Sequence, residues 1–425
     1  MSSTTDDAAA AVPRADDALP CGIALTAHDD GFRDDPHPAY DRLRTHAPRH
    51  QDAEYGRILL TRHDDVRRVL RERNFGVDAR RTREDSYMRR VAGTGVHERA
   101  GSTAYEPPLV LLDDPGHRRI RKLMARAFEP RAVEAMRPRI EAMAGELLAA
   151  LDGVQAADFI TAYAGPIPTR AILEMLGLRE ASVTDFKRMS EATLMGYDPH
   201  RGADVQAALR TAFIGMSAVF RAGVAERRAA PRDDLLSAMV RAQEDGDMLT
   251  DLEIVSLCTQ LMVAGNVTTT DLIGNGMYAL LTHPSELERL RADPGCVDAA
   301  VEEMLRFDCP ITETARIPFA DDRLGDCPVH VGDTLTASLA AANHDPDVFA
   351  DPHRFDIGRD ASEHLGFGSG IHVCLGASLA RLECRIAMQA FLQRFPGVRL
   401  DPSRPPERRR LPFFRGFTSL PLLLA

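Results

Sequence analysis

Apolar residues recur every three to four positions through most of the chain between Pro38 and Pro284, which is the period of an amphipathic helix. Runs typical of β-strands are confined to two places. These are 56–62, "GRILLTR", and 315–340, where turn residues separate several short runs. The chain shows no internal repeat and no long linker. The pattern therefore predicts a mainly α-helical fold with a small β portion.

One predicted helix is much longer than the rest. Thr250 and Glu253 have the spacing of a capping box at its start, and Pro284 ends it. About 32 residues at about 1.5 Å per residue give a length of roughly 48 Å, enough to cross a whole domain. We therefore expect this helix to be the central element of the fold. Its inward stripe comprises Ile254, Leu257, Leu261, Ala264, Thr268, Leu272 and Leu280.

The middle of this helix, "AGNVTTT" at 264–270, is locally unfavourable for helix formation. Gly265 costs about 1 kcal/mol in a helix interior, and the β-branched run from Val267 to Thr270 adds to that cost. The threonine hydroxyls can bond to carbonyls one turn earlier and bend the helix. Such local weakness often marks a functional site, and close packing of another element against Gly265 is the alternative explanation.

Composition narrows the class of protein. The chain has 425 residues, 44% of them hydrophobic, and a net charge of -11, which argues against generic nucleic-acid binding. Its seven cysteines form no CxxC pair, so neither a zinc ribbon nor a thioredoxin-like site is encoded, and a reducing cytoplasm fits best. No run of 18 apolar residues predicts a membrane span. The acidic segment 1–20 lacks the features of a signal peptide, and we expect a disordered leader there.

Cys374 stands in a glycine-rich loop directly before a helical run, within "HLGFGSGIHVCLGASLARLE" at 364–383. Nearby glycines are Gly368, Gly370 and Gly376. They allow backbone amides to point at the sulfur, and a helix beginning at about Leu375 adds its positive end, so both favour a thiolate. With Phe367 as a shielding aromatic, such a thiolate suits an axial ligand of haem iron better than a nucleophile with His372 as its base. A small buried core residue is the alternative.

The same loop fills the pattern Phe-x-x-Gly-x-x-x-Cys-x-Gly with Phe367, Gly370, Cys374 and Gly376. In this it resembles the cysteine-ligand loop of the cytochrome P450 family, the haem-thiolate monooxygenases, here of the soluble bacterial kind. The resemblance covers nearly the whole chain, so it implies one haem-binding domain at 21–425 with the cytochrome P450 fold. It also implies haem b, iron protoporphyrin IX, with Cys374 as the iron ligand. Residues expected against the haem are Ala264, Gly265, Thr268, Phe367, Gly368 and Gly376.

Three further stretches match the family in the same order along the chain, and one of them, "TETARIP", contains Arg316. "EEMLR" places Glu303 and Arg306 three residues apart, a spacing that by itself is typical of a surface salt bridge on a helix. The resemblance implies instead a buried structural network that these residues share with Arg354, with Arg359 as the alternative.

The resemblance also implies partners for the two haem propionates, namely His117, Arg121, Arg316 and His372. Several cationic or donor groups facing two carboxylates are what charge-assisted pairing at a buried haem edge requires. For His117 and Arg121, which lie in "DDPGHRRIRKLM", a solvated basic helix face is the alternative.

The chain departs from the family at one position of the long helix. Thr268 matches the family's threonine, but Val267 stands where the family usually has an acid that helps to deliver protons. Because valine cannot relay a proton, we expect Thr268 and ordered water to provide the catalytic proton route. A peroxide-driven or oxygen-independent haem-thiolate enzyme is the alternative, and a haem sensor or carrier is a more distant one.

The resemblance implies that the chain inserts one oxygen atom of O2 into a small organic substrate, by hydroxylation or epoxidation, in secondary metabolism. The segment 80–105 is polar and charged, which favours an oxygenated or polyfunctional substrate. The implied pocket residues are Gln260, Val263, Ala264, Ile311, Thr312 and Phe414.

Electrons are expected from NAD(P)H through a ferredoxin reductase and a ferredoxin. A basic run on an otherwise acidic protein favours a small acidic partner through charge complementarity, and a solvated helix face is the alternative. The basic residues that we expect on one outer face are Arg118, Arg119, Lys122 and Arg126. We expect a cytoplasmic monomer with no membrane and no nucleic-acid partner.

Overall fold

Helices make up most of the described chain, as the period of the apolar residues predicts. The structure is a computed structural model that describes residues 19–86, 88–89, 107–198, 200–244 and 247–424. Most of the predicted leader and most of the 80–105 segment lie outside the described residues. The α-helices are α1 (Asp30–Asp34), α2 (His37–His46), α3 (His63–Arg71), α5 (Gly116–Ala125), α6 (Pro130–Glu134), α7 (Arg137–Ala149), α8 (Pro166–Met175), α9 (Val183–Leu194), α10 (Ala203–Ala229), α11 (Leu235–Arg241), α12 (Asp251–Thr282), α13 (Pro284–Ala292), α14 (Val297–Phe307), α15 (Leu339–Ala342) and α16 (Ala377–Arg394).

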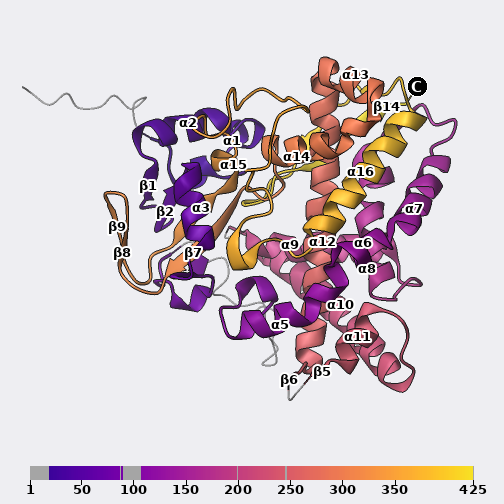
Figure 1. The fold of residues 1–425 in the computed structure, drawn as a ribbon, viewed down its shortest axis with the longest axis horizontal. Helices are drawn as coiled ribbons and strands as arrows, with labels where there is room; N and C mark the ends of the chain where they lie inside the picture. The colour runs from indigo at the N-terminus through magenta and orange to yellow at the C-terminus, as the bar shows by residue number, and fades with distance from the viewer. Residues whose placement is uncertain (1–18, 87, 90–106, 199, 245–246, 425) are drawn as a thin grey trace, which may run out of the picture.

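The strands fall where the two β-type stretches predict them and in a few short pairs elsewhere. They are β1 (Arg49–Asp52), β2 (Arg57–Leu60), β3 (Phe75–Gly76), β4 (Ala156–Asp158), β5 (Gln243–Glu244), β6 (Asp247–Met248), β7 (Glu313–Pro318), β8 (Asp322–Leu324), β9 (Cys327–Val329), β10 (Leu335–Ser338), β11 (Arg399–Leu400), β12 (Glu407–Arg408), β13 (Phe417–Ser419) and β14 (Pro421–Leu423). The largest sheet has the order β1-β2-β10-β7-β3, in which β2 and β10 are parallel and the other pairs antiparallel. The N-terminal helices and this sheet lie on one side of the molecule, and most of the longer helices lie on the other (Figure 1).

The long helix α12 forms as the sequence predicts. The Thr250 hydroxyl accepts from the Glu253 amide at 3.2 Å, and the Glu253 carboxylate accepts from the Thr250 amide at 2.7 Å, so both halves of the capping box are made. α12 has 32 residues and ends just before Pro284. It packs against α8, α9, α10, α14 and α16, and Figure 1 shows it running through the middle of the helical side.

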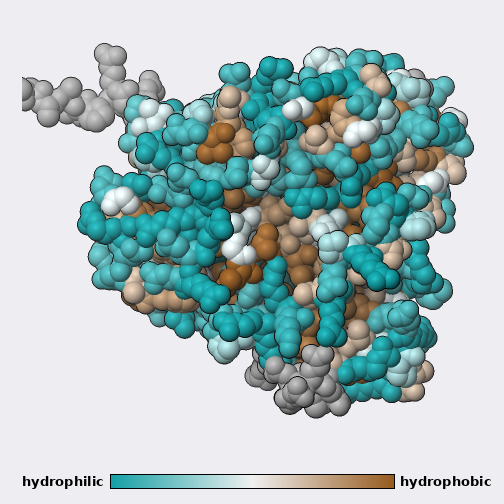
Figure 2. Space-filling view, in the orientation of Figure 1, coloured by the Kyte–Doolittle hydropathy of each residue, from teal (hydrophilic) through white to brown (hydrophobic). Residues whose placement is uncertain are grey.

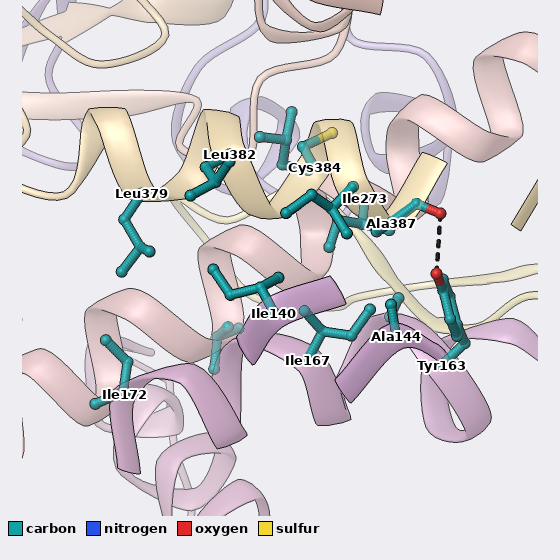
Figure 3. Packing of buried hydrophobic residues seen from close by; sticks show 14 of the residues in the cluster. Ile140, Ala144, Tyr163, Ile167, Ile172, Ile273, Leu379, Leu382, Cys384 and Ala387 are labelled. Atoms are coloured by element: carbon teal, nitrogen blue, oxygen red, sulfur yellow. Dashed lines mark hydrogen bonds between the residues drawn. The ribbon is translucent and has the colours of Figure 1, made fainter. Parts of the chain in front are cut away.

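Helix α16 follows the Cys374 loop and anchors it to the core. Figure 3 shows Leu379, Leu382 and Ala387 of α16 facing the layer that contains Ile140 of α7 and Ile167 of α8. These side chains belong to the main hydrophobic cluster and are buried, so they stabilise the position of α16 through area removed from water. The Tyr163 hydroxyl also donates to the Ala387 carbonyl at 3.0 Å (Figure 3). The Cys374 loop therefore ends at a helix that is firmly packed in the core.

Helix α10 is the one described helix that is long and apolar enough to cross a membrane by length and composition alone. In the structure its apolar residues Leu209, Met216 and Phe220 are buried, and the helix packs against α9, α11 and α12. An apolar helix in a protein layer satisfies the same test, so this helix does not establish a membrane span.

Candidate active site

The Cys374 loop is shaped by glycines and by the end of α3. Gly368 and Gly370 have φ values of 67° and 73°, a left-handed region that glycine adopts without strain. A Cβ at Gly370 would collide with the Leu70 carbonyl at the end of α3, so that position also excludes a side chain. The Cys374 amide donates to the Phe367 carbonyl at 2.9 Å and closes the loop. The glycine-rich motif thus encodes a tight turn that carries Cys374 at its tip.

The Cys374 sulfur is reachable by solvent but closely surrounded by protein. The side chain has accessible surface, yet burial raises the pKa of the thiol above its usual range. A hydrogen bond from the Gly376 amide and the charges of Arg121 and Arg381 act against this rise without overcoming it. Figure 2 shows one face of the molecule, on which a hollow with hydrophobic residues inside is surrounded by hydrophilic residues.

The Gly376 amide at the start of α16 favours a thiolate, as the sequence predicts, but desolvation of Cys374 raises the pKa of the thiol by more than this amide lowers it. α16 begins at Ala377, and its N-terminus supplies the Gly376 amide but no full charge. A metal ion at the sulfur would supply the missing positive charge and deprotonate the thiol. The donor set consequently fits an iron ligand better than a free nucleophile.

Arg381 is a neighbour of the loop that the sequence reasoning missed. Its guanidinium lies over the Phe367 ring, 4.6 Å from the centroid, and pairs with Glu302 at 2.6 Å. Its partner Glu302 lies on α14, 79 positions earlier in the chain, so no local sequence signal identifies the pair. Arg381 fixes Phe367 and adds positive potential near Cys374.

Four buried or half-buried donors gather beside the loop: His117, Arg121, Arg316 and His372. The His117 and His372 rings lie 4.2 Å apart between centroids, and the Nε2 atom of each is buried without a hydrogen-bond partner. Arg121 donates to the Val373 carbonyl at 2.7 Å, which places α5 against the Cys374 loop. Arg316 is 4% exposed and donates to the Ala315 carbonyl at 2.8 Å.

The two arginines of this cluster have no carboxylate partner among the described residues, whereas Asp114 lies 3.7 Å from His117 Nδ1. No described carboxylate pairs with Arg121 or Arg316 within 4.0 Å, and burial lowers the pKa of Arg316 to about 10. Burial followed by the charge of Arg316 also lowers the pKa of His372 to about 3. Buried cations without carboxylates are costly, so the cluster is built for anionic groups from a ligand. Two haem propionates fit this requirement.

The middle of α12 leaves one face uncovered by protein. Ala264 is exposed and Thr268 half-buried, although the neighbouring Val263 and Val267 are buried. The Thr268 hydroxyl donates to the Ala264 carbonyl at 2.5 Å, the back-bonding that the sequence predicts. Ala264 and Thr268 therefore lie on a face that a ligand can cover, while Val267 turns into the core at 2% exposure.

Gly265 was expected against the cofactor, and the structure gives a different reason for the glycine. A Cβ there would come within 2.9 Å of Ile172 Cδ1 on α8. Close packing of α8 on α12, the alternative explanation, accounts for this residue. By contrast, a Cβ at Gly376 would meet nothing nearer than Phe128 at 4.0 Å, so protein packing does not explain the glycine in the loop.

The Glu303–Arg306 pair forms a fully buried network. Arg306 donates to the two Glu303 oxygens at 2.7 and 2.9 Å, and both side chains are inaccessible. Its remaining hydrogen atoms go to the carbonyls of Asn343 at 2.9 Å, Pro352 at 2.8 Å and Arg354 at 3.3 Å. The pair therefore ties α14 to the segment that leads to the Cys374 loop.

The choice of Arg354 as the third member of this network is wrong. The Arg354 guanidinium is 63% exposed and lies near Asp356, at 3.5 Å. Arg359, the alternative, places its Nε 3.4 Å from Glu303 Oε1, and its side chain is only 12% exposed. The turn at 351–354 points the Arg354 side chain outward and uses only its backbone carbonyl, whereas the next turn brings Arg359 back under Glu303.

The residues predicted for the substrate pocket fall into two groups. Ile311 and Phe414 form an isolated β-bridge, and the Thr312 amide donates to the Phe413 carbonyl at 2.9 Å. Thr312 and Phe414 line an open pocket of about 450 Å³, solvent included, that does not touch Cys374 or α12. The second group lies on α12.

On α12, Val263 is buried next to the exposed Ala264. Gln260 Oε1 accepts from the Leu109 amide at 2.7 Å, which ties the turn at Leu109–Leu111 to α12. The exposure of Ala264 thus supports its place in the wall of a substrate pocket. Gln260 instead uses its side-chain oxygen to bind the backbone at Leu109.

The basic outer face of α5 is smaller than predicted. Arg118, Lys122 and Arg126 are exposed, and Arg118 pairs with Asp114 at 2.7 Å. Arg119 is half-buried and its guanidinium pairs with Glu253 in the first turn of α12, so its placement on the outer face was wrong. The exposed basic face is therefore defined by Arg118, Lys122 and Arg126, beside the Cys374 loop.

Comparison with known proteins identifies the family to which the chain is similar. The family model described as Cytochrome P450 matches residues 202–294 and 296–421. The cytochrome P450 monooxygenase PikC of Streptomyces venezuelae is 39% identical over 95% of both chains. The 6-deoxyerythronolide B hydroxylase of Saccharopolyspora erythraea is 36% identical over 93% of this chain and 97% of that protein. Among solved structures, the bacillaene polyketide synthase cytochrome P450 PksS of Bacillus subtilis superposes with a TM-score of 0.83 at 32% identity, covering 94% of this chain and 99% of that one.

Proposed function

The chain belongs to the cytochrome P450 family of haem enzymes, and from that premise we propose that it is a monooxygenase for an oxygenated, polyketide-type small molecule, with electrons from an acidic ferredoxin. The observation that carries the proposal is the buried Arg316 and half-buried Arg121, which lack a carboxylate partner among the described residues, beside the glycine-shaped loop that carries Cys374. Both features match the two ends of an iron porphyrin, its metal and its propionates.

Haem, when bound, supplies the reductive activation of dioxygen. Cys374 would ligate the iron, with Gly376 donating to its sulfur and Arg381 holding Phe367 beside it. A hydrogen bond and nearby cations of this kind decrease the electron density on the sulfur and so tune its donor strength. Arg121, Arg316 and the two histidines would hold the propionates and exclude water from the rim.

Proton transfer is assigned to Thr268. Its hydroxyl donates to the Ala264 carbonyl, so its oxygen lone pairs remain free to accept from an ordered water on the open face of α12. Val267 is buried in the core, where it contributes packing and no proton. The residue at the family's acid position therefore takes no part, and Thr268 with water carries the transfer.

The substrate class rests on relatives and on the charged segment 80–105. The relative from Saccharopolyspora erythraea is named for hydroxylation of 6-deoxyerythronolide B, and PksS belongs by name to polyketide synthesis. The many polar and charged residues in the sequence of segment 80–105 favour a substrate with several oxygen functions. We infer hydroxylation or epoxidation of such a molecule.

The substrate proposal is tested by a spectral-shift screen of the haem-loaded protein with polyketide lactones, fatty acids and steroids. We expect the lactones to give the largest shift from a low-spin to a high-spin spectrum and to be converted with O2 and NAD(P)H. With 18O-labelled O2, a product about 18 mass units heavier than the substrate, against about 16 with ordinary O2, would support oxygen insertion. Turnover with hydrogen peroxide alone, and none with electron donors, would instead establish the peroxide-driven alternative.

The electron-donor proposal is tested by the rate of first-electron transfer from a ferredoxin at several ionic strengths. Steering by charge requires this rate to fall as salt rises. Lys122→Glu with Arg126→Glu should lower the rate and flatten its salt dependence. The control Arg399→Glu with Arg404→Glu changes the net charge equally at exposed positions after α16. Equal effects in the two double variants would remove the face of α5 from the docking site.

A further inference from the structure

Three histidines from separate segments meet at the N-terminal side of the molecule, away from Cys374. His37 opens α2, His344 follows α15 and His353 lies in the turn before Phe355. One ring nitrogen of each lies within 4.8 Å of a ring nitrogen of both others. His344 is 1% exposed, while the His353 side chain is 47% exposed and gives the cluster access to solvent. Neither the haem site nor the proposed function uses these residues.

Hydrogen bonds fix the tautomers of His344 and His353. His344 Nε2 lies 2.9 Å from the Phe307 carbonyl, which can only accept, so this nitrogen carries the hydrogen atom. His353 Nε2 lies 2.8 Å from the carboxylate of Asp41, which is likewise an acceptor. In the neutral rings, both Nδ1 atoms are therefore left with lone pairs. These two Nδ1 atoms are 3.2 Å apart.

Two lone pairs facing each other at that distance repel unless a cation lies between or beside them. The separation is close to the roughly 3.3 Å between nitrogens that bind one tetrahedral Zn²⁺ at about 2.0–2.1 Å. Metal-binding histidines usually donate their other N–H to a carboxylate or a backbone carbonyl, which is the arrangement that Asp41 and the Phe307 carbonyl provide.

His37 supplies a third nitrogen. Its Nδ1 atom is buried without a hydrogen-bond partner, so it gives up no bond on binding a ligand. The ring stacks on His344 with 3.8 Å between centroids and 29° between planes. A rotation of the His37 ring about its side-chain bonds is needed to turn its lone pair toward the other two nitrogens.

We propose that His344, His353 and His37 bind a divalent transition-metal ion such as Zn²⁺, with Asp41 orienting His353 and water completing the coordination. Imidazole nitrogens favour Zn²⁺, Cu²⁺ and Ni²⁺ over the hard cations Mg²⁺ and Ca²⁺. The ion joins α2 to the segment between α15 and the Cys374 loop. It holds the residues next to Asn343, Pro352 and Arg354, whose carbonyls accept from Arg306. The site therefore braces the Glu303–Arg306 network from outside.

The test uses the full-length, haem-loaded protein without a histidine tag. Zinc titrated by calorimetry should bind with a stoichiometry of one per chain, and elemental analysis after dialysis should give one zinc per iron. His353→Gln and Asp41→Asn should each weaken binding by roughly 10–100-fold. The control His46→Gln removes an exposed histidine from the other end of α2 and should bind zinc as the parent does.

A spectroscopic readout separates a built site from a chance one. Co²⁺ should give visible ligand-field bands of tetrahedral strength in the parent, and these should be lost in His353→Gln. His353 is half-exposed, so this variant should keep its far-ultraviolet circular dichroism and haem absorbance, which are measured in parallel. Equal zinc affinity in the parent and in His353→Gln would overturn the proposal and show that zinc binds adventitiously. The short contact between the two Nδ1 atoms would then be explained by a proton that they share.

Discussion

Replacing Arg359 should destabilise the protein far more than replacing Arg354, five positions earlier. Arg359→Met and Arg354→Met each remove one guanidinium and keep an apolar stem of similar size. Arg359 Nε lies 3.4 Å from the buried Glu303 carboxylate. Its Nη2 atom donates to the carbonyls of Asp351 at 3.0 Å and Arg354 at 3.2 Å, and its Nη1 atom donates to the Ala350 carbonyl. The matched pair thus compares a cation held against a buried carboxylate with one near an exposed turn.

The magnitude follows from these contacts. Two charges 3.4 Å apart at an effective dielectric constant of about 20 attract by about 5 kcal/mol before the cost of desolvation is subtracted. In Arg359→Met, Glu303 keeps its hydrogen bonds from Arg306 and from the Asp356 amide. Part of the cost of burying the Glu303 charge is therefore still offset. We therefore expect Arg359→Met to lower the free energy of unfolding by about 2–3 kcal/mol. Arg354→Met loses only an exposed pair with Asp356 and should change it by about 0.5 kcal/mol or less.

The assay is urea unfolding of the haem-loaded proteins, followed by Soret absorbance and by far-ultraviolet circular dichroism. Coincident transitions by the two probes justify one free energy per variant. A loss in Arg354→Met equal to or larger than that in Arg359→Met would refute the assignment of Arg359 to the Glu303 network.

Three further changes have defined outcomes. Thr268→Ala should raise hydrogen peroxide release per NAD(P)H and lower product yield. The Thr270 hydroxyl donates to the Asn266 carbonyl in the core, so the control Thr270→Ala should leave the product formed per NAD(P)H unchanged. Equal product per NAD(P)H in the two variants would mean that Thr268 only bends the helix. Arg316→Leu should speed haem transfer to apomyoglobin roughly 10–100-fold, because one charge-assisted bond to a propionate is lost; an unchanged transfer rate would contradict its role. Burial raises the pKa of Glu383 to about 8, so the folded state holds a proton that the unfolded state releases between about pH 4.5 and 8. Stability should therefore fall by a few kcal/mol as pH rises through this window, and Glu383→Gln should flatten the fall in thermal midpoint; an equal pH slope in the variant would assign it to other groups.

The sequence predicts the elements with strong local signals. The capping box at Thr250 and Glu253 and the stop at Pro284 place α12 because they satisfy or break backbone hydrogen bonds at its ends. The glycine pattern around Cys374 predicts its loop because positive φ values select glycine. Periodicity likewise separates the helical region from the strands of 315–340.

What the sequence leaves open depends on the direction of side chains in irregular segments. The sequence "FADPHRFDIGR" does not indicate which of its two arginines contacts Glu303, because side chains in turns do not follow a fixed periodicity. Arg119 shares a helix with exposed cations, but its partner Glu253 is 134 positions away. The histidine cluster likewise unites α2 with residues about 300 positions later, and such contacts arise only from tertiary packing.

The central claim is that Cys374 ligates haem iron, and the spectrum of the reduced protein with carbon monoxide tests it most directly. The parent and the control Cys327→Ser should both show the strongly red-shifted Soret band of thiolate ligation. Cys374→Ser should retain its helical circular dichroism and lose that band. A red-shifted band that survives in Cys374→Ser, or its absence from the parent loaded with haem, would contradict the account.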